Sequence, residues 1–148
     1  MERVDKTILT NMCMVCDGSR VLVEEKVGKG YKGIIFPGGH VEENEPIVDS
    51  VIREIWEETG LTIENPRLIG VKDWMQEDVR YIVFLFKADK YSGSLKSSDE
   101  GEVFWVERDE LLNLPVMWHM DQMIRIFITE EFAELYLDAG NGWSPVLK

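Results

Sequence analysis

The sequence predicts an α+β protein in which a mixed β-sheet packs between helices. Runs rich in β-branched and aromatic residues lie on both sides of one amphipathic helical pattern, and a second helical pattern comes late in the chain. A chain of 148 residues fits one domain, expected to span residues 1–148, and at this size roughly 70% of the unfolded surface is buried. That is enough for a sizeable core.

The expected strands are separated by turn-forming residues. Asp17-Gly18-Ser19 suits a hairpin connection between the first two strands, and residues 139–142 suit a hairpin turn between the last two. The glycine-rich stretch 27–32 predicts a loop, which either faces a substrate or is a solvated connector. The predicted strands cover residues 7–16, 20–25, 61–63, 68–73, 79–89, 102–106, 133–137 and 143–147.

The clearest helix is predicted over 46–59. Pro46 suits the first helical position and Gly60 would end the helix. Its apolar residues recur at helical spacing, so they form one face that must pack on the sheet. These residues are Ile47, Val48, Val51, Ile52 and Ile55. A second helix is predicted over about 117–128.

Three glutamates share one stripe of the first helix, beside its apolar face. Glu54, Glu57 and Glu58 are spaced i, i+3 and i+4, and each like-charged neighbouring pair costs roughly 0.2–0.5 kcal/mol. They also lie in the last turns, where the helix dipole disfavours each acidic side chain by a further ~0.3–1 kcal/mol. A bound divalent cation would offset both penalties, and oxygen ligands without His or Cys favour Mg²⁺ or Mn²⁺. The alternative is a solvated acidic face whose repulsion Arg53 partly relieves.

The turn ahead of this helix strengthens the metal interpretation. Phe36-Pro37-Gly38-Gly39 places two glycines where the backbone must turn tightly or come close to a ligand. The carbonyl groups of such a turn could complete the coordination of a metal. A metal site beside a glycine-rich turn suggests phosphate chemistry.

The net charge, the lack of long apolar runs and the two cysteines limit the classes of partner, the cellular location and the role of the thiols. Twenty-eight acidic and 16 basic residues give a formal charge of −12, which argues against a nucleic-acid duplex or an anionic membrane as partner. No apolar run approaches the ~20 residues of a membrane-spanning helix, and the first residues lack the apolar core of a signal peptide, so the cytoplasm is the expected location. Cys13 and Cys16 should point to opposite faces of a strand and are expected to be structural thiols.

Gly39, Glu45 and residues 53–61 together form one pattern, G-x5-E-x7-R-E-I-x-E-E-x-G-L. It resembles the Nudix box, G-x5-E-x7-R-E-U-x-E-E-x-G-U with U aliphatic, at every fixed position. The resemblance implies a Nudix fold, an α/β/α sandwich with a central mixed sheet. It also implies a hydrolase that acts on a nucleoside diphosphate linked to another moiety.

The resemblance assigns roles to the metal-binding positions of the box. Glu57 and Glu58 would bind Mg²⁺, with Mn²⁺ as a substitute. Glu54 would be either a further ligand or the base that activates water. Gly38 would lend its carbonyl group to the metal.

Other carried-over positions would support this centre. Arg53, which we place in the catalytic set, and Glu45 would hold the loop and orient the glutamates. MutT-type enzymes keep an additional carboxylate outside the box, and Glu100 is the expected match, with Glu102 as the second choice. The alternative for Glu100 is a plain acidic turn residue.

The resemblance to oxidised-purine nucleotide diphosphatases also suggests a base pocket. Trp118 would stack on the purine and Asp121 would read its edge, unless these residues serve core packing and helix capping. Asn11 and Lys26 match polar positions that bind substrate in those enzymes. Ile35 replaces an Asn that contacts the base there, so base specificity stays open.

The leading hypothesis is a Mg²⁺-dependent pyrophosphohydrolase of (oxidised) purine nucleoside triphosphates such as 8-oxo-dGTP, which releases a nucleoside monophosphate and pyrophosphate. A second reading keeps the chemistry but changes the substrate to ADP-ribose, a dinucleoside polyphosphate or an RNA 5′ end. A third is a non-catalytic nucleotide-binding Nudix module, and a fourth is an acidic helix that binds cations for stability alone. Monomer and homodimer are both compatible with the sequence.

Overall fold

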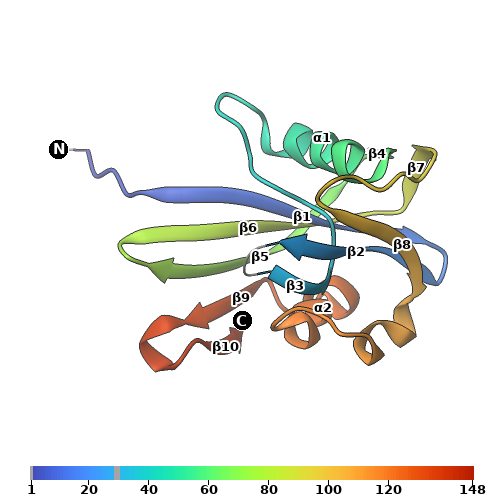
Figure 1. Ribbon diagram of the computed structural model, residues 1–148. Coiled ribbons are helices and arrows are strands. Elements are labelled where there is room, and N and C mark those ends of the chain that lie inside the picture. The colour runs from blue at the N-terminus through green and yellow to red at the C-terminus, as the bar shows by residue number, and fades with distance from the viewer. Residues whose placement is uncertain (1, 29–30) are drawn as a thin grey trace.

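The computed structural model describes residues 2–28 and 31–148 (Figure 1). Its strands are β1 (Thr7–Asp17), β2 (Arg20–Gly28), β3 (Tyr31–Ile35), β4 (Leu61–Glu64), β5 (Arg67–Gln76), β6 (Val79–Ala88), β7 (Lys90–Gly93), β8 (Gly101–Glu107), β9 (Glu134–Asp138) and β10 (Ser144–Leu147). Its helices are α1 (Ile47–Thr59) and α2 (Met120–Thr129), with two short 3₁₀ helices, η1 (Arg108–Asn113) and η2 (Ala139–Asn141).

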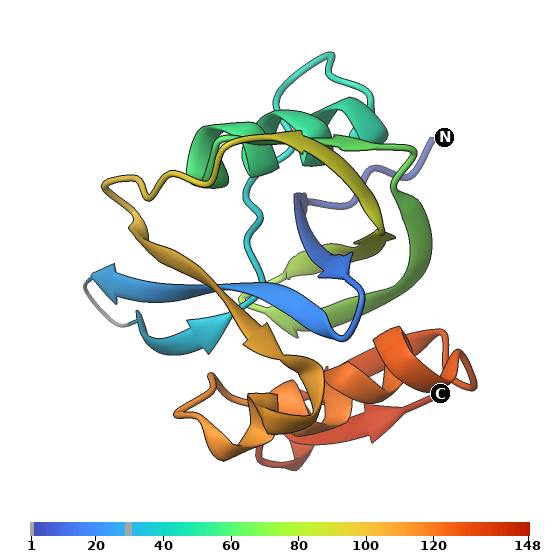
Figure 2. The same cartoon turned by 90° about the vertical axis from the view of Figure 1, so that its right-hand side faces the viewer.

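The described residues build a mixed sheet between two helical layers. An eight-stranded sheet has the order β10-β9-β5-β6-β1-β2-β3, with β8 paired to β2, while β4 and β7 form a separate two-stranded sheet. The pairs β1–β6 and β5–β9 are parallel and the other pairs are antiparallel. Helix α1 covers one side and α2 the other (Figure 2). The predicted α+β class with a mixed central sheet is confirmed.

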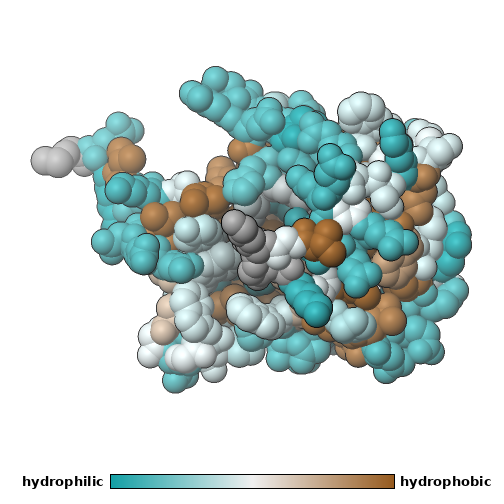
Figure 3. All heavy atoms as spheres, in the orientation of Figure 1, coloured by the Kyte–Doolittle hydropathy of each residue, from teal (hydrophilic) through white to brown (hydrophobic). Residues whose placement is uncertain are grey.

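The core divides into two clusters, one on each side of the sheet. Val51 and Ile55 of α1 are fully buried against the sheet, and α2 packs its own apolar face on the opposite side. Cys13 belongs to the α1 cluster whereas Cys16 packs against the α2 cluster, and both thiols are free, as expected from strand geometry. The outward surface of α1 is largely hydrophilic (Figure 3), although Val48, expected on the apolar face, is exposed.

Two regions differ from the predicted elements. The loop predicted over 27–32 is wrong at both ends. Strand β2 continues to Gly28 and β3 begins at Tyr31, because the backbones of the two strands pair with each other. Residues 29–30 of that prediction lie outside the described residues. Strand β7 was not predicted, because Ser92-Gly93 are residues typical of turns. In the structure they pair with β4. Pairing with a neighbouring strand supplied order that local sequence preference does not encode.

Helix α2 begins three residues later than predicted. The segment before it is bound to β3, because the amide of Met117 donates to the carbonyl of Ile34 (3.0 Å) and the amide of Ile34 donates to that of Pro115 (3.0 Å). His119 then takes a left-handed φ of 62°, which is incompatible with the interior of a right-handed helix. The start of α2 is therefore set by a tertiary contact, and it brings residues 115–118 to the edge of β3.

Candidate active site

Residues 37–39, the glycine turn, run beside β1. Amides of β1 donate to the carbonyl groups of Pro37 (3.0 Å) and Gly39 (2.8 Å). In an extended segment the amide and carbonyl of one residue share a side, and those of its neighbours take the other. The peptide groups of Gly38 therefore face away from β1, and its amide donates to Glu58 Oε2 at 3.0 Å.

Close packing explains why this turn contains two glycines. A Cβ atom on Gly38 would overlap the backbone of β1 at Asn11, and one on Gly39 would overlap the carboxylate of Glu54. The Asn11 side chain tightens the same contact: its Oδ1 accepts from the Gly39 amide (3.1 Å), and its Nδ2 donates to Ser50 Oγ on α1 (2.9 Å). Both ends of the Asn11 amide thus join the turn to the helix.

Arg53 connects the loop before α1 with the helix glutamates. Its Nε donates to Glu45 Oε2 (2.7 Å), and its Nη1 donates to Glu54 Oε1 (2.9 Å) and Glu57 Oε2 (3.1 Å). Its Nη2 donates to Glu45 Oε1 and to the carbonyl of His40, both at 3.0 Å. The hydrogen bonds to Arg53 hold the pKa of Glu45 below its usual range, and those to Glu45 hold the pKa of Arg53 above its own.

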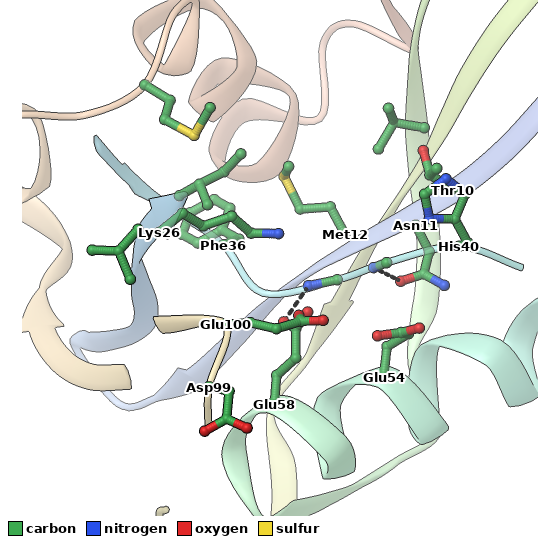
Figure 4. A pocket seen from close by; sticks show the side chains of 16 residues that line it. Thr10, Asn11, Met12, Lys26, Phe36, His40, Glu54, Glu58, Asp99 and Glu100 are labelled. Atoms are coloured by element: carbon green, nitrogen blue, oxygen red, sulfur yellow. Dashed lines mark hydrogen bonds between the residues drawn. The ribbon is translucent and has the colours of Figure 1, made fainter. Parts of the chain in front are cut away.

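Carboxylates from three separate elements meet beside Gly38. Glu24 on β2, Glu58 on α1 and Glu100 before β8 each offer an oxygen within 4.8 Å of the other two. Glu24 and Glu58 are buried, whereas Glu100 is exposed at the mouth of the site. Figure 4 shows Glu58 and Glu100 close together beneath the glycine turn, with Glu54 further along α1.

The protein alone holds these negative charges at a cost. Burial is the main reason that the pKa of Glu58 is raised, and its contacts with Glu100 and Glu24 raise it further. Burial also raises the pKa of Glu54, although the hydrogen bond from Arg53 opposes this effect. A cation bound here would favour the charged forms of both side chains.

This donor set fits a hard divalent cation. Within the described residues, both carboxylate oxygens of Glu24 and Oε1 of Glu58 are buried without a hydrogen-bond partner. Buried carboxylates normally have a paired charge, hydrogen-bond donors or a metal. Carboxylate and backbone carbonyl oxygens are the ligands that Mg²⁺ and Mn²⁺ prefer.

A cavity of about 580 Å³ opens over the carboxylates. It lies between the glycine turn, β1, β2 and α1, and six of the site residues predicted from the sequence line it. These are Asn11, Lys26, Gly38, Glu54, Glu58 and Glu100.

A second cavity of about 770 Å³ adjoins the first, and Ile35 and Met117 line both. Three tryptophans line it, one of them the predicted Trp118, a residue that is 85% exposed. Lys72 also lines this cavity; burial lowers its pKa, and its Nζ lies 5.7 Å from the ring centroid of Trp74. The two cavities therefore adjoin, one lined by carboxylates and the other by aromatic rings.

Several predicted residues lie apart from these cavities. Glu57 projects from α1 toward Arg53, has a half-exposed side chain and lines neither cavity. Asp121, exposed on the first turn of α2, also lines neither. Of the two acidic candidates outside the box, Glu100 joins the carboxylate group and Glu102 does not.

The sequence analysis missed Glu24. A signal for it exists, because Glu24 follows the apolar run Val21-Leu22-Val23 and shares a strand face with Lys26, two residues on. A charged residue that interrupts a buried strand is unusual unless it has a partner. The partners come from distant elements, α1 and the residues before β8, so the signal could not be interpreted without the fold.

The fold and the carboxylate site are those of a hydrolase of phosphoanhydride bonds, and comparison with known proteins identifies the family. The NUDIX domain model matches residues 7–127, so the chain belongs to the Nudix family. The Nudix hydrolase YvcI of Bacillus subtilis is 38% identical over 110 residues, which cover 70% of this chain and 68% of that protein. Phosphatase NudJ of Escherichia coli K12 is 28% identical over 111 residues, 72% of each chain.

Solved structures agree with the family assignment. A MutT protein from Bacillus halodurans superimposes with a TM-score of 0.72 at 28% identity, covering 94% of both chains. The predicted Nudix fold with a MutT-like relationship is confirmed. None of the helices in the described part of the chain has the length and apolar character needed to cross a membrane.

Proposed function

We propose that this protein is a Mg²⁺-dependent pyrophosphohydrolase of oxidised purine nucleoside triphosphates such as 8-oxo-dGTP, built as a single Nudix domain over residues 1–148. One observation carries the proposal: an acidic cavity and an aromatic cavity share Ile35 and Met117. A nucleoside triphosphate has the matching halves, a polyphosphate that binds with divalent cations and a flat base that stacks on aromatic rings.

The acidic cavity would hold the reacting phosphates. The proposed metal ligands are Glu54, Glu57, Glu58, Glu100 and the carbonyl of Gly38; of these, Glu57 lies outside the acidic cavity, in contact with Arg53. When bound, the cation would neutralise the polyphosphate and lower the pKa of an attacking water. Glu54 remains the candidate base for that water, because burial raises its pKa toward the range in which a carboxylate accepts a proton effectively.

Cationic and amide side chains would position the substrate and the ligands. Lys26 lines the acidic cavity opposite the glutamates (Figure 4), where its ammonium can bind a phosphate oxygen. Arg53 and Asn11 would act by positioning, since their side chains bind protein groups rather than open space. Water adds to phosphorus, the bond to the pyrophosphate oxygen breaks, and the products are a monophosphate and pyrophosphate.

The aromatic cavity would hold the base. Trp118 offers an exposed ring for stacking, and Asp121, in the first turn of α2, is proposed to read the purine edge. Ile35 contributes an apolar wall where an Asn stands in similar enzymes, so shape and stacking would account for more of the base selectivity than a hydrogen bond at that position.

The decisive experiment measures pyrophosphate and orthophosphate release separately, with Mg²⁺, from 8-oxo-dGTP, dGTP, ATP, ADP-ribose and Ap4A. We expect pyrophosphate release that is fastest for 8-oxo-dGTP and lost in Glu58→Gln but retained in Glu64→Gln, a control on the exposed face of β4. Preference for ADP-ribose or Ap4A would refute the substrate assignment. Orthophosphate as the first product would refute the bond assignment and favour a phosphatase activity, as the name of NudJ states for that relative.

Absence of turnover on every substrate would favour a non-catalytic nucleotide-binding module. Tight 8-oxo-dGTP binding without hydrolysis would identify that case. A Mg²⁺-dependent rise in melting temperature with no nucleotide binding would leave a purely structural metal site.

A further inference from the structure

Glu24 is a carboxylate buried in the middle of a sheet. It lies on β2 between β3 and β8, opposite Ile35 and Val103 in the two pairing registers. The side chain is completely buried, as are the residues Val21–Val23 that precede it. A charged residue at such a position needs a partner to be tolerated.

No protein group in the described part of the chain satisfies this carboxylate. Neither of its oxygens accepts a hydrogen bond, and no Lys, Arg or His nitrogen of those residues lies within 4.0 Å of it. One oxygen of Glu58 and one of Glu100 lie within 4.8 Å of it, and their negative charges would repel its own. The cluster thus has three acidic members, and one of them, Glu24, is fully buried and unsatisfied.

The backbone around Glu24 leaves room for this arrangement. A Cβ atom at Gly101, which pairs with Lys26 at the end of β8, would lie 3.1 Å from both Cγ and Oε1 of Glu24. A larger residue at 101 would crowd the Glu24 carboxylate. The glycine therefore allows the strand carrying Glu24 and the residue next to Glu100 to approach each other.

We propose that Glu24 is a further ligand of the divalent cation at the catalytic centre, contributed by the sheet rather than by the helix. This assignment rests on the proposed hydrolase function and extends its ligand set. With Glu24, the inner cation site would be formed by β2, α1 and the loop before β8, whereas Glu57 faces outward on the same helix. Cation binding would then tie three elements together that repel one another in the metal-free protein.

The test compares Glu24→Gln with Glu25→Gln, the next residue on β2, which is exposed. Mn²⁺ affinity is measured without nucleotide by electron paramagnetic resonance titration, and melting temperature is measured with and without Mn²⁺. For Glu24→Gln we expect at least tenfold weaker Mn²⁺ binding, a higher melting temperature in chelator and a smaller Mn²⁺-induced rise. Glu25→Gln should match the wild type in all three.

Wild-type Mn²⁺ affinity in Glu24→Gln would overturn the proposal. If that variant does not fold, Glu24→Asp keeps the charge and withdraws the carboxylate by one methylene group; weaker Mn²⁺ binding is expected, and unchanged binding would again overturn the proposal. Because no nucleotide is present, these results do not depend on the substrate. Failure of 8-oxo-dGTP hydrolysis with normal Glu24-dependent Mn²⁺ binding would refute the proposed function alone.

Discussion

Alanine at each glycine of the turn should separate the geometry of the site from the stability of the fold. Neither Gly38 nor Gly39 has a left-handed φ, so the effect of alanine is steric at both. At position 39 the new Cβ would lie 2.6 Å from Glu54 Oε1, and ordinary contact begins at 3.4 Å. The carboxylate must therefore move by about 1 Å, a displacement that can reduce turnover by roughly 100-fold.

The two substitutions should differ in stability. The Glu54 carboxylate can rotate away, and alanine also reduces the entropy of the unfolded chain, so Gly39→Ala should change the free energy of unfolding by less than about 1 kcal/mol. At Gly38 the obstacle is the backbone of β1, which cannot rotate, and overpacking there should cost about 3 kcal/mol or more. Urea unfolding and Mg²⁺-dependent pyrophosphate release measure both effects. Wild-type turnover in Gly39→Ala would refute the steric reasoning.

Substitutions at three further residues test the positioning of the glutamates, the base pocket and a buried carboxyl group. Arg53→Ala removes the common hydrogen-bond donor of three glutamates and should lower kcat about 100-fold. Arg53→Lys should not restore kcat, because an ammonium group cannot reproduce the planar fork of the guanidinium. Wild-type kcat in Arg53→Lys would contradict the positioning role. Trp118→Ala should raise KM for 8-oxo-dGTP roughly tenfold, since stacking on an aromatic ring contributes about 1–3 kcal/mol per base. The melting temperature should stay unchanged, because Trp118 is exposed. An unchanged KM would exclude the ring from the base pocket. Burial, followed by contact with Glu134, raises the pKa of Asp73 to about 6, against the opposing effect of Arg80. The native state therefore binds this proton more tightly than the unfolded state. The contribution of the protonated Asp73 carboxyl to the free energy of unfolding is complete below about pH 4 and is lost as the pH rises to about 6. The stability of wild type relative to Asp73→Asn should fall across that interval in urea unfolding, and parallel pH profiles would contradict the assignment.

Local sequence patterns predicted the bounds of those elements that depend mainly on their own residues. Pro46, Gly60 and the apolar spacing located α1 within one residue at its start, and the turn at Asp17-Gly18-Ser19 located the β1–β2 hairpin. The start of α2 and the pairing of β7 depend on contacts with β3 and β4, which no local pattern contains. These elements could not be predicted from propensity alone.

The site follows the same division. The motif located Glu54 and Glu58 on one helix face. The glycine turn was expected to turn tightly or to approach a ligand, and in the structure its close approaches are to β1 and to the carboxylates of Glu54 and Glu58. The sequence could not indicate that β2 would bring Glu24 to the same point, because strand pairing and helix packing jointly determine that position. Arg53 was expected to relieve part of the repulsion among the helix glutamates, and its Nη1 lies 3.1 Å from Glu57 Oε2.

The central claim is that cation-dependent cleavage of a phosphoanhydride bond takes place beside Glu58. The most direct measurement is a Mg²⁺ titration of pyrophosphate release from 8-oxo-dGTP by wild type and by Glu58→Gln, with folding of both checked by circular dichroism. We expect saturable Mg²⁺ activation in the wild type and at least a 100-fold loss in the variant, in line with removal of one strong charge-stabilising group. Equal pyrophosphate release by the two proteins, or release that continues undiminished in chelator, would contradict the claim.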